Sequence, residues 1–576
     1  MLFLIRDLLV FVVVIGGLTV ALGQLAARFD PLERLTIGVA AGVAFFGAAE
    51  FTIYATNASG TWHWVLAFIA IGAGLMTWSR ASAWASDPTV RQAVTWWLVF
   101  VLWCVGGAAL ILTYNGGGWA GDWDEHYQRA QFFLHHWPMD FRFIAMYLLP
   151  ARPPLANVAT SGFLALTDDR YVQFQVFTVL LNSLVFFPTL LFARLWKIGT
   201  RGAVLVALGL MLNPSVMENA TFAWTKLIAT FYALTATYFL LRDVRQPDRA
   251  SVAAAAAALA AGVLVHYSVI PWMLAFGTAW IFARRHPWTD LAFVRTLVMA
   301  FLIFALPVAA WVFWSVTHYG WHGTLASNTS VVTESAPGVA NAFTALGQKI
   351  WNSIIPYPVR EPTLPMLAQQ NSLGWLRDEA FCLFQINLPG ILGAASLVML
   401  WRAWRSPTVT DIPRAAAAEC GFWIIGILAV IPLGIGVHGE TDRMGVAHIC
   451  LQPLVALALA FGLARLGREL HTGLSRALAW ILGLAAAIDL TLGIGLQWAA
   501  EAGVLEHTRY DSIDAYLHSL TFFAQANYGG KLRLGQPFLH DAPGMNAAVV
   551  VALLAVVLAF TAWMALRHSK PTPAEN

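Results

Sequence analysis

The sequence predicts an all-α polytopic membrane protein, and three observations lead to this fold class. Hydrophobic residues make up 59% of the 576-residue chain, which contains 26 tryptophans and has a mean hydropathy of +0.65. This apolar content exceeds what one soluble core can bury. The apolar residues fall in long runs, and Lys and Arg collect in every second connection between them, as is typical of loops on the cytoplasmic side of a membrane.

About fifteen apolar runs approach or reach the roughly 20 residues that a membrane-spanning helix needs. They cover residues 3–24, 35–56, 61–79, 94–113, 171–193, 202–217, 219–241, 251–267, 269–283, 294–316, 386–401, 417–437, 446–464, 477–498 and 547–566. The alternation of basic connections places the C-terminus in the cytoplasm and the N-terminus on the outer side.

Three long connections, 114–170, 318–385 and 499–546, then fall on the outer side of the membrane. Long loops carry function more often than short ones. The first of them includes "FRFIAMYLLP" and "NVATSGFLAL". These apolar, aromatic-rich stretches predict helices that lie along the membrane interface rather than across it.

The first outer loop also contains "GDWDEHYQRAQ", an unusual concentration of charge in a chain with 11% charged residues. In a helix, Asp124 would share a face with Gln128, and Glu125 with Arg129. Carboxylates held near apolar surface can have altered proton affinity and can act as bases. The alternative is an ordinary outer-surface helix start, in which Asp122 is the N-cap and Glu125 pairs with Arg129.

"DWDEHYQRAQFF", followed by "ARPPLANV" and "DDRYVQFQVFTVLLNSLVFF", resembles the start of the GT-C class of membrane glycosyltransferases. The likeness is to the branch of protein O-mannosyltransferases and lipid A aminoarabinose transferases, and it covers roughly residues 94–320. The matching residues, in order, are Asp124, Glu125, Tyr127, Pro153, Pro154 and Arg170. The resemblance implies a GT-C-like catalytic core over 91–320, with additional transmembrane helices in 1–90. An outer loop over 321–385 would cover the donor cavity, and 386–576 would supply C-terminal transmembrane helices.

The resemblance further implies an enzyme that moves a sugar from a polyprenyl-phosphate carrier to a hydroxyl of a lipid, glycan or protein, on the extracytoplasmic face of a bacterial inner membrane. A hydroxyl needs a base, for which Asp124 is the candidate, with Glu125 beside it. A lipid phosphate leaving group needs cations. The candidates for these are Lys226, Arg152, Arg170 and Arg443, and the further candidates for the substrate cavity are Asp122, Tyr127, Glu218 and His266.

Several alternatives stay open at this point. Lys226 can instead extend to the lipid headgroups, and His266 can be a satisfied polar residue at a helix junction. The Asp122-x-Asp124 pattern suits a divalent metal with oxygen ligands, although a helix cap explains it equally well. A membrane transporter is an alternative function, supported by Asp489 within a predicted span. An oligosaccharide ligase or polymerase is another alternative function. The dispersed net charge of +3 gives no indication of a nucleic-acid partner.

Overall fold

The computed structural model describes residues 2–110, 122–284 except 145, 146 and 200, 290–326, 414–435, 448–469 and 544–567, with a few isolated positions besides. Every regular element in these ranges is a helix, apart from one isolated bridge between Phe143 and Tyr147. Eight of the described helices are long and apolar enough to cross a membrane. The chain is therefore an all-α integral membrane protein, which confirms the predicted fold class.

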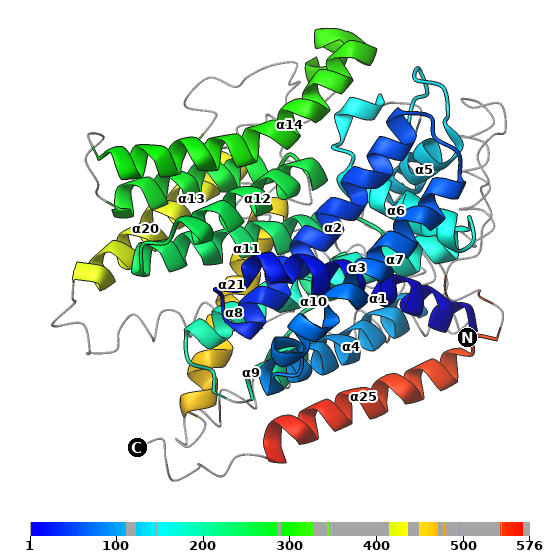
Figure 1. Ribbon diagram of the computed structural model, residues 1–576. Helices are drawn as coiled ribbons and strands as arrows, with labels where there is room; N and C mark the ends of the chain where they lie inside the picture. The colour runs from blue at the N-terminus through cyan, green and yellow to red at the C-terminus, as the bar shows by residue number, and fades with distance from the viewer. Residues whose placement is uncertain are drawn as a thin grey trace.

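The described helices follow one another along the chain as shown in Figure 1. The first half contains α1 (Leu2–Leu22), η1 (Gly23–Ala26), α2 (Pro31–Ala55), α3 (Thr61–Ala85), α4 (Pro88–Ala108), α5 (Asp122–His135), η3 (Leu149–Ala151), α6 (Leu155–Leu166), α7 (Tyr171–Ser183), α8 (Phe186–Leu195), α9 (Gly202–Met211) and α10 (Pro214–Thr221). The second half contains α11 (Lys226–Arg245), α12 (Arg249–Val265), α13 (Val269–Arg284), α14 (Leu291–Ala326), α20 (Arg414–Ile435), α21 (His448–Glu469) and α25 (Ala547–Arg567).

The predicted spans within the described residues agree with these helices except that 171–193 divides into α7 and α8 and that the chain breaks between residues 211 and 226. The runs 202–217 and 219–241 divide into three helices, because Pro214 starts a new helix after Met211 and the chain leaves helical geometry again before Lys226. Asn213 caps the short middle helix by accepting a hydrogen bond from the amide of Val216 at 3.2 Å. The predicted spans 386–401 and 477–498 lie almost wholly outside the described residues.

The two interface helices predicted in the first outer loop have different outcomes. Within 141–150, the described residues form an extended turn closed by Phe143 and Tyr147 and a single 3₁₀ turn, η3, so the helix predicted there is wrong. Ile144 has a φ of 42°, which is incompatible with a continuous right-handed helix. The second stretch is helical, as α6, but it is buried on nearly all sides. It belongs to the protein core rather than to the membrane interface.

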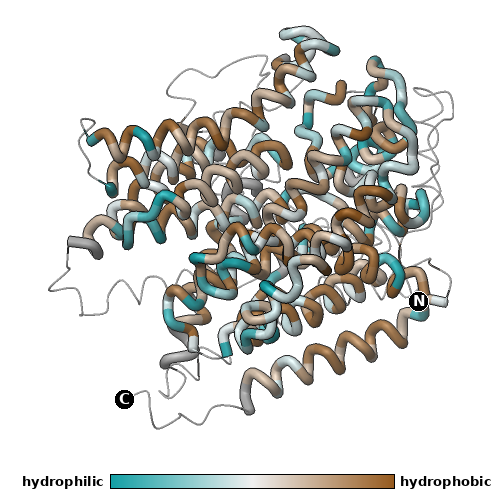
Figure 2. Tube along the Cα trace, in the orientation of Figure 1, coloured by the Kyte–Doolittle hydropathy of each residue, from teal (hydrophilic) through white to brown (hydrophobic). Residues whose placement is uncertain are grey.

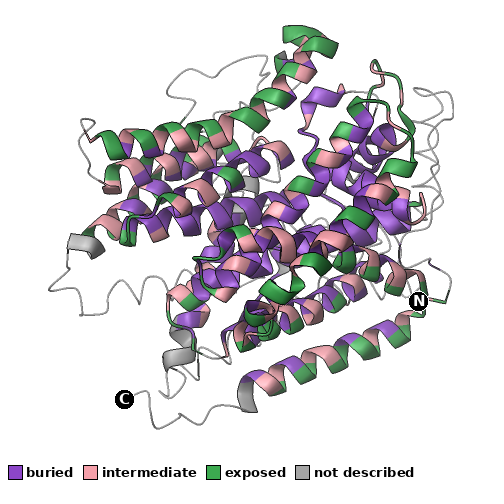
Figure 3. Cartoon of the chain, viewed as in Figure 1, coloured by how far each residue is buried: buried purple, intermediate pink, exposed green. Residues whose placement is uncertain are grey.

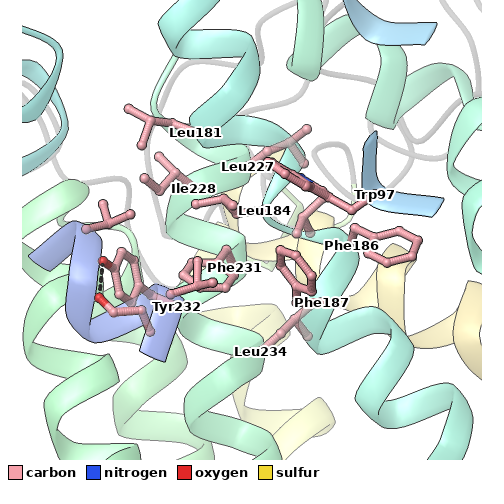
Figure 4. Packing of buried hydrophobic residues seen from close by; sticks show 14 of the residues in the cluster. Trp97, Leu181, Leu184, Phe186, Phe187, Leu227, Ile228, Phe231, Tyr232 and Leu234 are labelled. Carbon is pink, nitrogen blue, oxygen red and sulfur yellow. Dashed lines mark hydrogen bonds between the residues drawn. The ribbon is translucent and has the colours of Figure 1, made fainter. Parts of the chain in front are cut away.

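The core is a layer of almost wholly buried helices, α7 and α11, surrounded by helices that face outward (Figure 3). Trp97, Phe187 and Phe231 are among the side chains that fill the contact between them (Figure 4). The hydroxyl of Tyr232 donates to the carbonyl of Ala40 in α2 at 2.9 Å. By contrast, α14 and α25 are strongly apolar yet expose much of their surface (Figure 2), as expected of helices in contact with lipid.

Helices α1–α3 belong to the same packed core as the rest of the bundle. α1 packs on α2, α3 and α7, and α2 packs on α6. The contact between α1 and α3 is a backbone contact, because a Cβ on Gly74 would lie 2.6 Å from the Cα of Gly17. Small residues that allow such close approach are a common means of helix association in membranes.

An ionic network joins five helices at one end of the bundle. Its ion pairs are Arg28–Asp248 (2.5 Å), Arg242–Asp248 (2.8 Å), Arg242–Glu33 (3.2 Å), Arg284–Asp243 (3.2 Å) and Arg245–Glu419 (2.5 Å). These arginines come from connections that the sequence assigned to a single side of the membrane, and the structure brings them together. Lys226 lies at the opposite end of the 20-residue helix α11, about 30 Å away at 1.5 Å per residue.

The α1–α3 contact leads to a prediction about stability. We expect Gly17→Ala and Gly74→Ala to destabilise the protein by about 1–3 kcal/mol, because the added methyl group meets backbone atoms that cannot move aside. Gly16→Ala and Gly72→Ala are the controls, since a Cβ at either position has no atom within 4 Å. Thermal unfolding in detergent measures the effect; an equal loss in all four variants would contradict a specific contact.

Candidate active site

The acidic stretch forms α5, which begins at Asp122 and presents three of its charged side chains to the protein interior. Asp124, Glu125 and Arg129 are 4%, 0% and 0% exposed. The expected i,i+4 pairs are both present, Gln128 with Asp124 and Arg129 with Glu125. The helix expected from the sequence is present, but the solvated outer-surface version of it is wrong, because these side chains are buried. The role of Asp122 as its N-cap stays a prediction.

Glu125 is at the centre of a buried ionic cluster. Arg129 donates to its Oε1 through Nε at 2.9 Å and approaches the same oxygen through Nη2 at 2.8 Å. Arg152, which follows η3, lies 3.6 Å from Oε2. Burial opposes ionisation of Glu125, but the charges of Arg152 and Arg129 outweigh it and hold the pKa of Glu125 well below its usual range. Glu125 is thus a fixed anion between two guanidinium groups.

The extended segment that replaces the predicted helix completes the coordination of Arg129. Nη1 of Arg129 donates to the carbonyl of Leu149 at 2.8 Å, and Nη2 donates to that of Leu148 at 3.4 Å. The guanidinium also lies over the ring of Phe143, 4.2 Å from its centroid. Both carbonyls also accept a local hydrogen bond, Leu148 from the amide of Ala151 at 3.1 Å and Leu149 from that of Arg152 at 3.3 Å, so each carbonyl oxygen serves the 3₁₀ turn and the arginine together.

Asp124 lies in a different electrostatic environment from its neighbour. Its Oδ2 accepts a hydrogen bond from Nε2 of Gln128 at 2.6 Å, and Gln128 in turn accepts from the amide of Ile144 at 2.9 Å. Burial raises the pKa of Asp124 to about 7, and the hydrogen bond from Gln128 opposes the rise only in part. A carboxyl group that titrates near neutrality is suited to accept a proton.

Lys226 is the first residue of α11 and is 1% exposed. Its ammonium group lies over the ring of Trp224, so it does not extend to the headgroups. The preceding turn is held by Asn182 of α7, whose Nδ2 donates to the carbonyls of Asn219 and Trp224 at 3.2 and 2.8 Å. Oδ1 of the same side chain accepts from the amide of Ile228 at 3.2 Å. One buried amide therefore fixes the start of the helix that presents the lysine.

His266 connects Lys226 electrostatically with two further basic side chains, Arg152 and His126. His266 is the C-cap of α12; burial, and then the charges of Arg152, Lys226 and His126, lower its pKa well below the usual value. His126 of α5 is coupled in turn to Glu125, Arg129 and Arg152. Two of the cations expected from the sequence, Arg152 and Lys226, therefore both act on His266, which the sequence analysis placed in the substrate cavity.

The remaining predicted residues have varied positions. Tyr127 packs edge-on against Tyr171 and near Phe174, at ring distances of 5.4 and 5.3 Å. Glu218 is buried in α10. Arg170 is the exposed N-cap of α7 and is not brought to the cluster. Arg443, the side chain of Asp122, and Asp489 lie outside what the structure describes.

The described residues contain no group of three or more His, Cys, Asp or Glu side chains arranged to hold a metal ion. Asp124 is engaged by Gln128 rather than by another acid. The metal site suggested by the Asp-x-Asp pattern depends on Asp122, whose side chain is not described, and so it stays a prediction.

The sequence interpretation missed three residues that organise the site: His126, Asn157 and Asn182. His126 stands between the motif residues, and its Nδ1 lies 3.1 Å from Oδ1 of Asn157 in α6. Asn157 and Asn182 could have been identified as polar side chains within apolar runs. An amide in such a helix is costly unless it has a defined partner.

No family model matches the sequence, and no curated protein matches it. Solved structures do match in fold. One is ArnT from Cupriavidus metallidurans bound to undecaprenyl phosphate, with 16% identity and a TM-score of 0.46 over 82% of this chain and 75% of ArnT. Its apo form gives 16% identity and a TM-score of 0.42 over 82% and 76%.

The archaeal oligosaccharyltransferase AglB from Archaeoglobus fulgidus, in complex with an inhibitory peptide and a dolichol-phosphate, also matches. It has 13% identity and a TM-score of 0.39 over 78% of this chain and 61% of AglB. The likeness to ArnT and to AglB concerns the fold alone.

Arg129 provides a test of the ionic cluster. We expect Arg129→Leu to destabilise the protein by about 3–5 kcal/mol, because it leaves Glu125 as a buried charge without its closest partner. The exposed Arg170→Ala is the control, and we expect it to change stability by no more than about 0.5 kcal/mol. Unfolding in detergent measures both; a loss confined to the control would refute the assignment.

Asp124 gives a prediction for pH. A carboxyl whose pKa is raised on folding stabilises the fold fully below its unfolded pKa of about 3.9, and this contribution is lost as the pH rises through about 7. Wild-type protein should therefore lose stability relative to Asp124→Asn between about pH 4 and pH 8. Melting temperatures of the two proteins across this range measure the difference. A difference independent of pH would show that Asp124 titrates normally.

Proposed function

We propose that this protein is a membrane glycosyltransferase that moves a sugar from a polyprenyl-phosphate carrier to a hydroxyl of a lipid, glycan or protein. The observation that carries the proposal is that Arg152 pairs with Glu125 of α5, the helix of Asp124, while Arg152 and Lys226 both act electrostatically on the buried His266. Guanidinium and ammonium groups, with a neutral imidazole N–H beside them, are groups that bind phosphate oxygens.

The residues divide the reaction between them. Asp124 accepts the proton of the acceptor hydroxyl as its oxygen forms a bond to the anomeric carbon. The bond from that carbon to the carrier phosphate breaks, and its electron pair passes to the phosphate oxygen, where Arg152, Lys226 and His266 stabilise the charge. Nδ1 of His266 accepts from the amide of Ser268 at 3.2 Å. Nε2 therefore carries the proton in the neutral ring, so it can donate to a phosphate oxygen.

Glu125 is a positioning residue in this scheme. Its two guanidinium neighbours keep it ionised, so it is unsuited to exchange protons near neutral pH. Its Oε2 lies 3.6 Å from Arg152, whose side chain is 11% exposed. Glu125 therefore helps to position Arg152. The proposed donor side is extracytoplasmic, because Lys226 lies at the end of α11 opposite the arginine network that marks the cytoplasmic side.

The transporter alternative receives less support from the described residues. A transporter places ionisable groups near the middle of the membrane. The buried acids of the described long helices, which are Asp7, Glu33, Glu50 and Asp243, lie near helix ends instead. The raised pKa of Asp124 also favours base-assisted attack over an oligosaccharide ligase that relies on Arg and His alone.

The first test is binding of undecaprenyl phosphate to the detergent-purified protein, followed by native mass spectrometry. We expect wild type to bind, Lys226→Ala to bind about 10- to 100-fold more weakly because a charge-assisted contact is lost, and Asp124→Asn to bind like wild type. Lys197→Ala is the matched control, since Lys197 is exposed in the connection between α8 and α9. Absence of binding by wild type would refute the proposed function.

A further inference from the structure

His126 has an unusual position for a residue with no assigned task in the chemistry above. It is 1% exposed, and it lies one residue after Glu125 on α5. One ring nitrogen, Nδ1, lies 3.1 Å from the amide oxygen of Asn157. The other, Nε2, is buried and has no hydrogen-bond partner among the described residues.

The partner of Nδ1 determines what Nε2 can do. An amide oxygen only accepts hydrogen bonds, so Nδ1 of His126 carries the proton of the neutral ring and Nε2 presents a lone pair. The ring is neutral because burial, together with the charges of Arg129 and Arg152 acting against that of Glu125, lowers the pKa of His126 to about 3. With so low a proton affinity His126 is no general base. It remains a hydrogen-bond acceptor.

The two histidines of the site therefore have opposite hydrogen-bonding capacity. In His266 the atom Nδ1 accepts from a backbone amide, which leaves Nε2–H as a donor suited to phosphate oxygen. In His126 the atom Nδ1 donates to Asn157, which leaves Nε2 as an acceptor suited to O–H. Leaving a buried acceptor unsatisfied costs about 1–3 kcal/mol, so such an atom at a candidate site indicates a group on the ligand that satisfies it.

We propose that Nε2 of His126 accepts a hydrogen bond from a neutral hydroxyl group of the carrier-linked sugar and so helps to select the sugar that is transferred. This inference rests on the proposed function and deepens it. Because the guanidinium groups of Arg129 and Arg152 both lie beside Glu125, we expect this position to disfavour an ammonium group, which like charges repel. A sugar that places a hydroxyl there is therefore preferred over one that places a charged amine there.

Two substitutions separate the two ring nitrogens. His126→Asn places an amide nitrogen near the position of Nδ1 and can keep the contact with Asn157, but it has nothing at the position of Nε2. His126→Gln reaches the position of Nε2 with an amide oxygen and restores an acceptor. A purely structural role for His126 depends on the contact with Asn157, so it predicts that the Asn variant behaves more like wild type than the Gln variant does.

The experiment measures dissociation constants of the full-length protein in detergent for bare undecaprenyl phosphate and for undecaprenyl phosphate linked to glucose, mannose, arabinose or an amino-substituted arabinose. We expect wild type to bind at least one hydroxyl-bearing glycosylated carrier more tightly than the bare carrier. His126→Asn should reduce this preference about tenfold while leaving the affinity for the bare carrier within about twofold, and His126→Gln should retain most of it.

The outcomes distinguish this inference from the function on which it rests. If wild type does not bind the bare carrier, the proposed function and the inference both fail. If wild type binds the bare carrier but no sugar adds affinity, or if the Asn and Gln variants lose the preference equally, only the role of His126 fails. Tighter binding of the amino-substituted arabinose than of arabinose itself would overturn the preference for a neutral hydroxyl.

Discussion

Arg129 places a full positive charge in the protein interior with no exposed surface, and the chain around it is arranged to satisfy that charge. Glu125 neutralises it, two carbonyls of the 148–149 segment accept its protons, and the ring of Phe143 covers its face. Removal of any of these partners would leave the buried ion less well compensated and would lower the stability of the fold. The site therefore depends on this arginine, because its contacts fix α5 relative to the extended segment that leads to Arg152.

The same arrangement separates the behaviour of two adjacent carboxyl groups. Glu125 faces two guanidinium groups and remains ionised, whereas Asp124 faces an amide and titrates near neutrality. The difference comes from their environment and not from their chemistry, since the two side chains are one residue apart on a helix and point to different neighbours. A pair of this kind provides both a permanent anion that orders cations and a group that can exchange a proton.

Sequence reasoning could predict the parts of this site that depend on local spacing. The Asp124–Gln128 and Glu125–Arg129 contacts follow from helical periodicity. The start of a helix at Lys226 does not follow from the apolar run, because that run begins at residue 219 and the structure breaks it before Lys226. Burial of α5 could not be predicted in this way, because a polar helix in a membrane protein reads as a surface helix. Residues 141–150 were misassigned for a related reason: apolar and aromatic residues are equally suited to an interface helix and to a buried extended segment.

The helices of residues 1–90 reach the site through a chain of contacts that no local pattern shows. Arg6 of α1 donates to Asp168 at 2.9 Å, and the adjacent Asp169 accepts from His135 and Gln131, both on the last turns of α5. A displacement of α1 would therefore be transmitted to the end of α5 through the adjacent residues Asp168 and Asp169. Glu50 of α2 occupies the space next to Gly162 of α6. Helix α2 therefore also packs against α6, the helix that contains Asn157. These additional helices therefore help to position α5 and α6, with which they share one core.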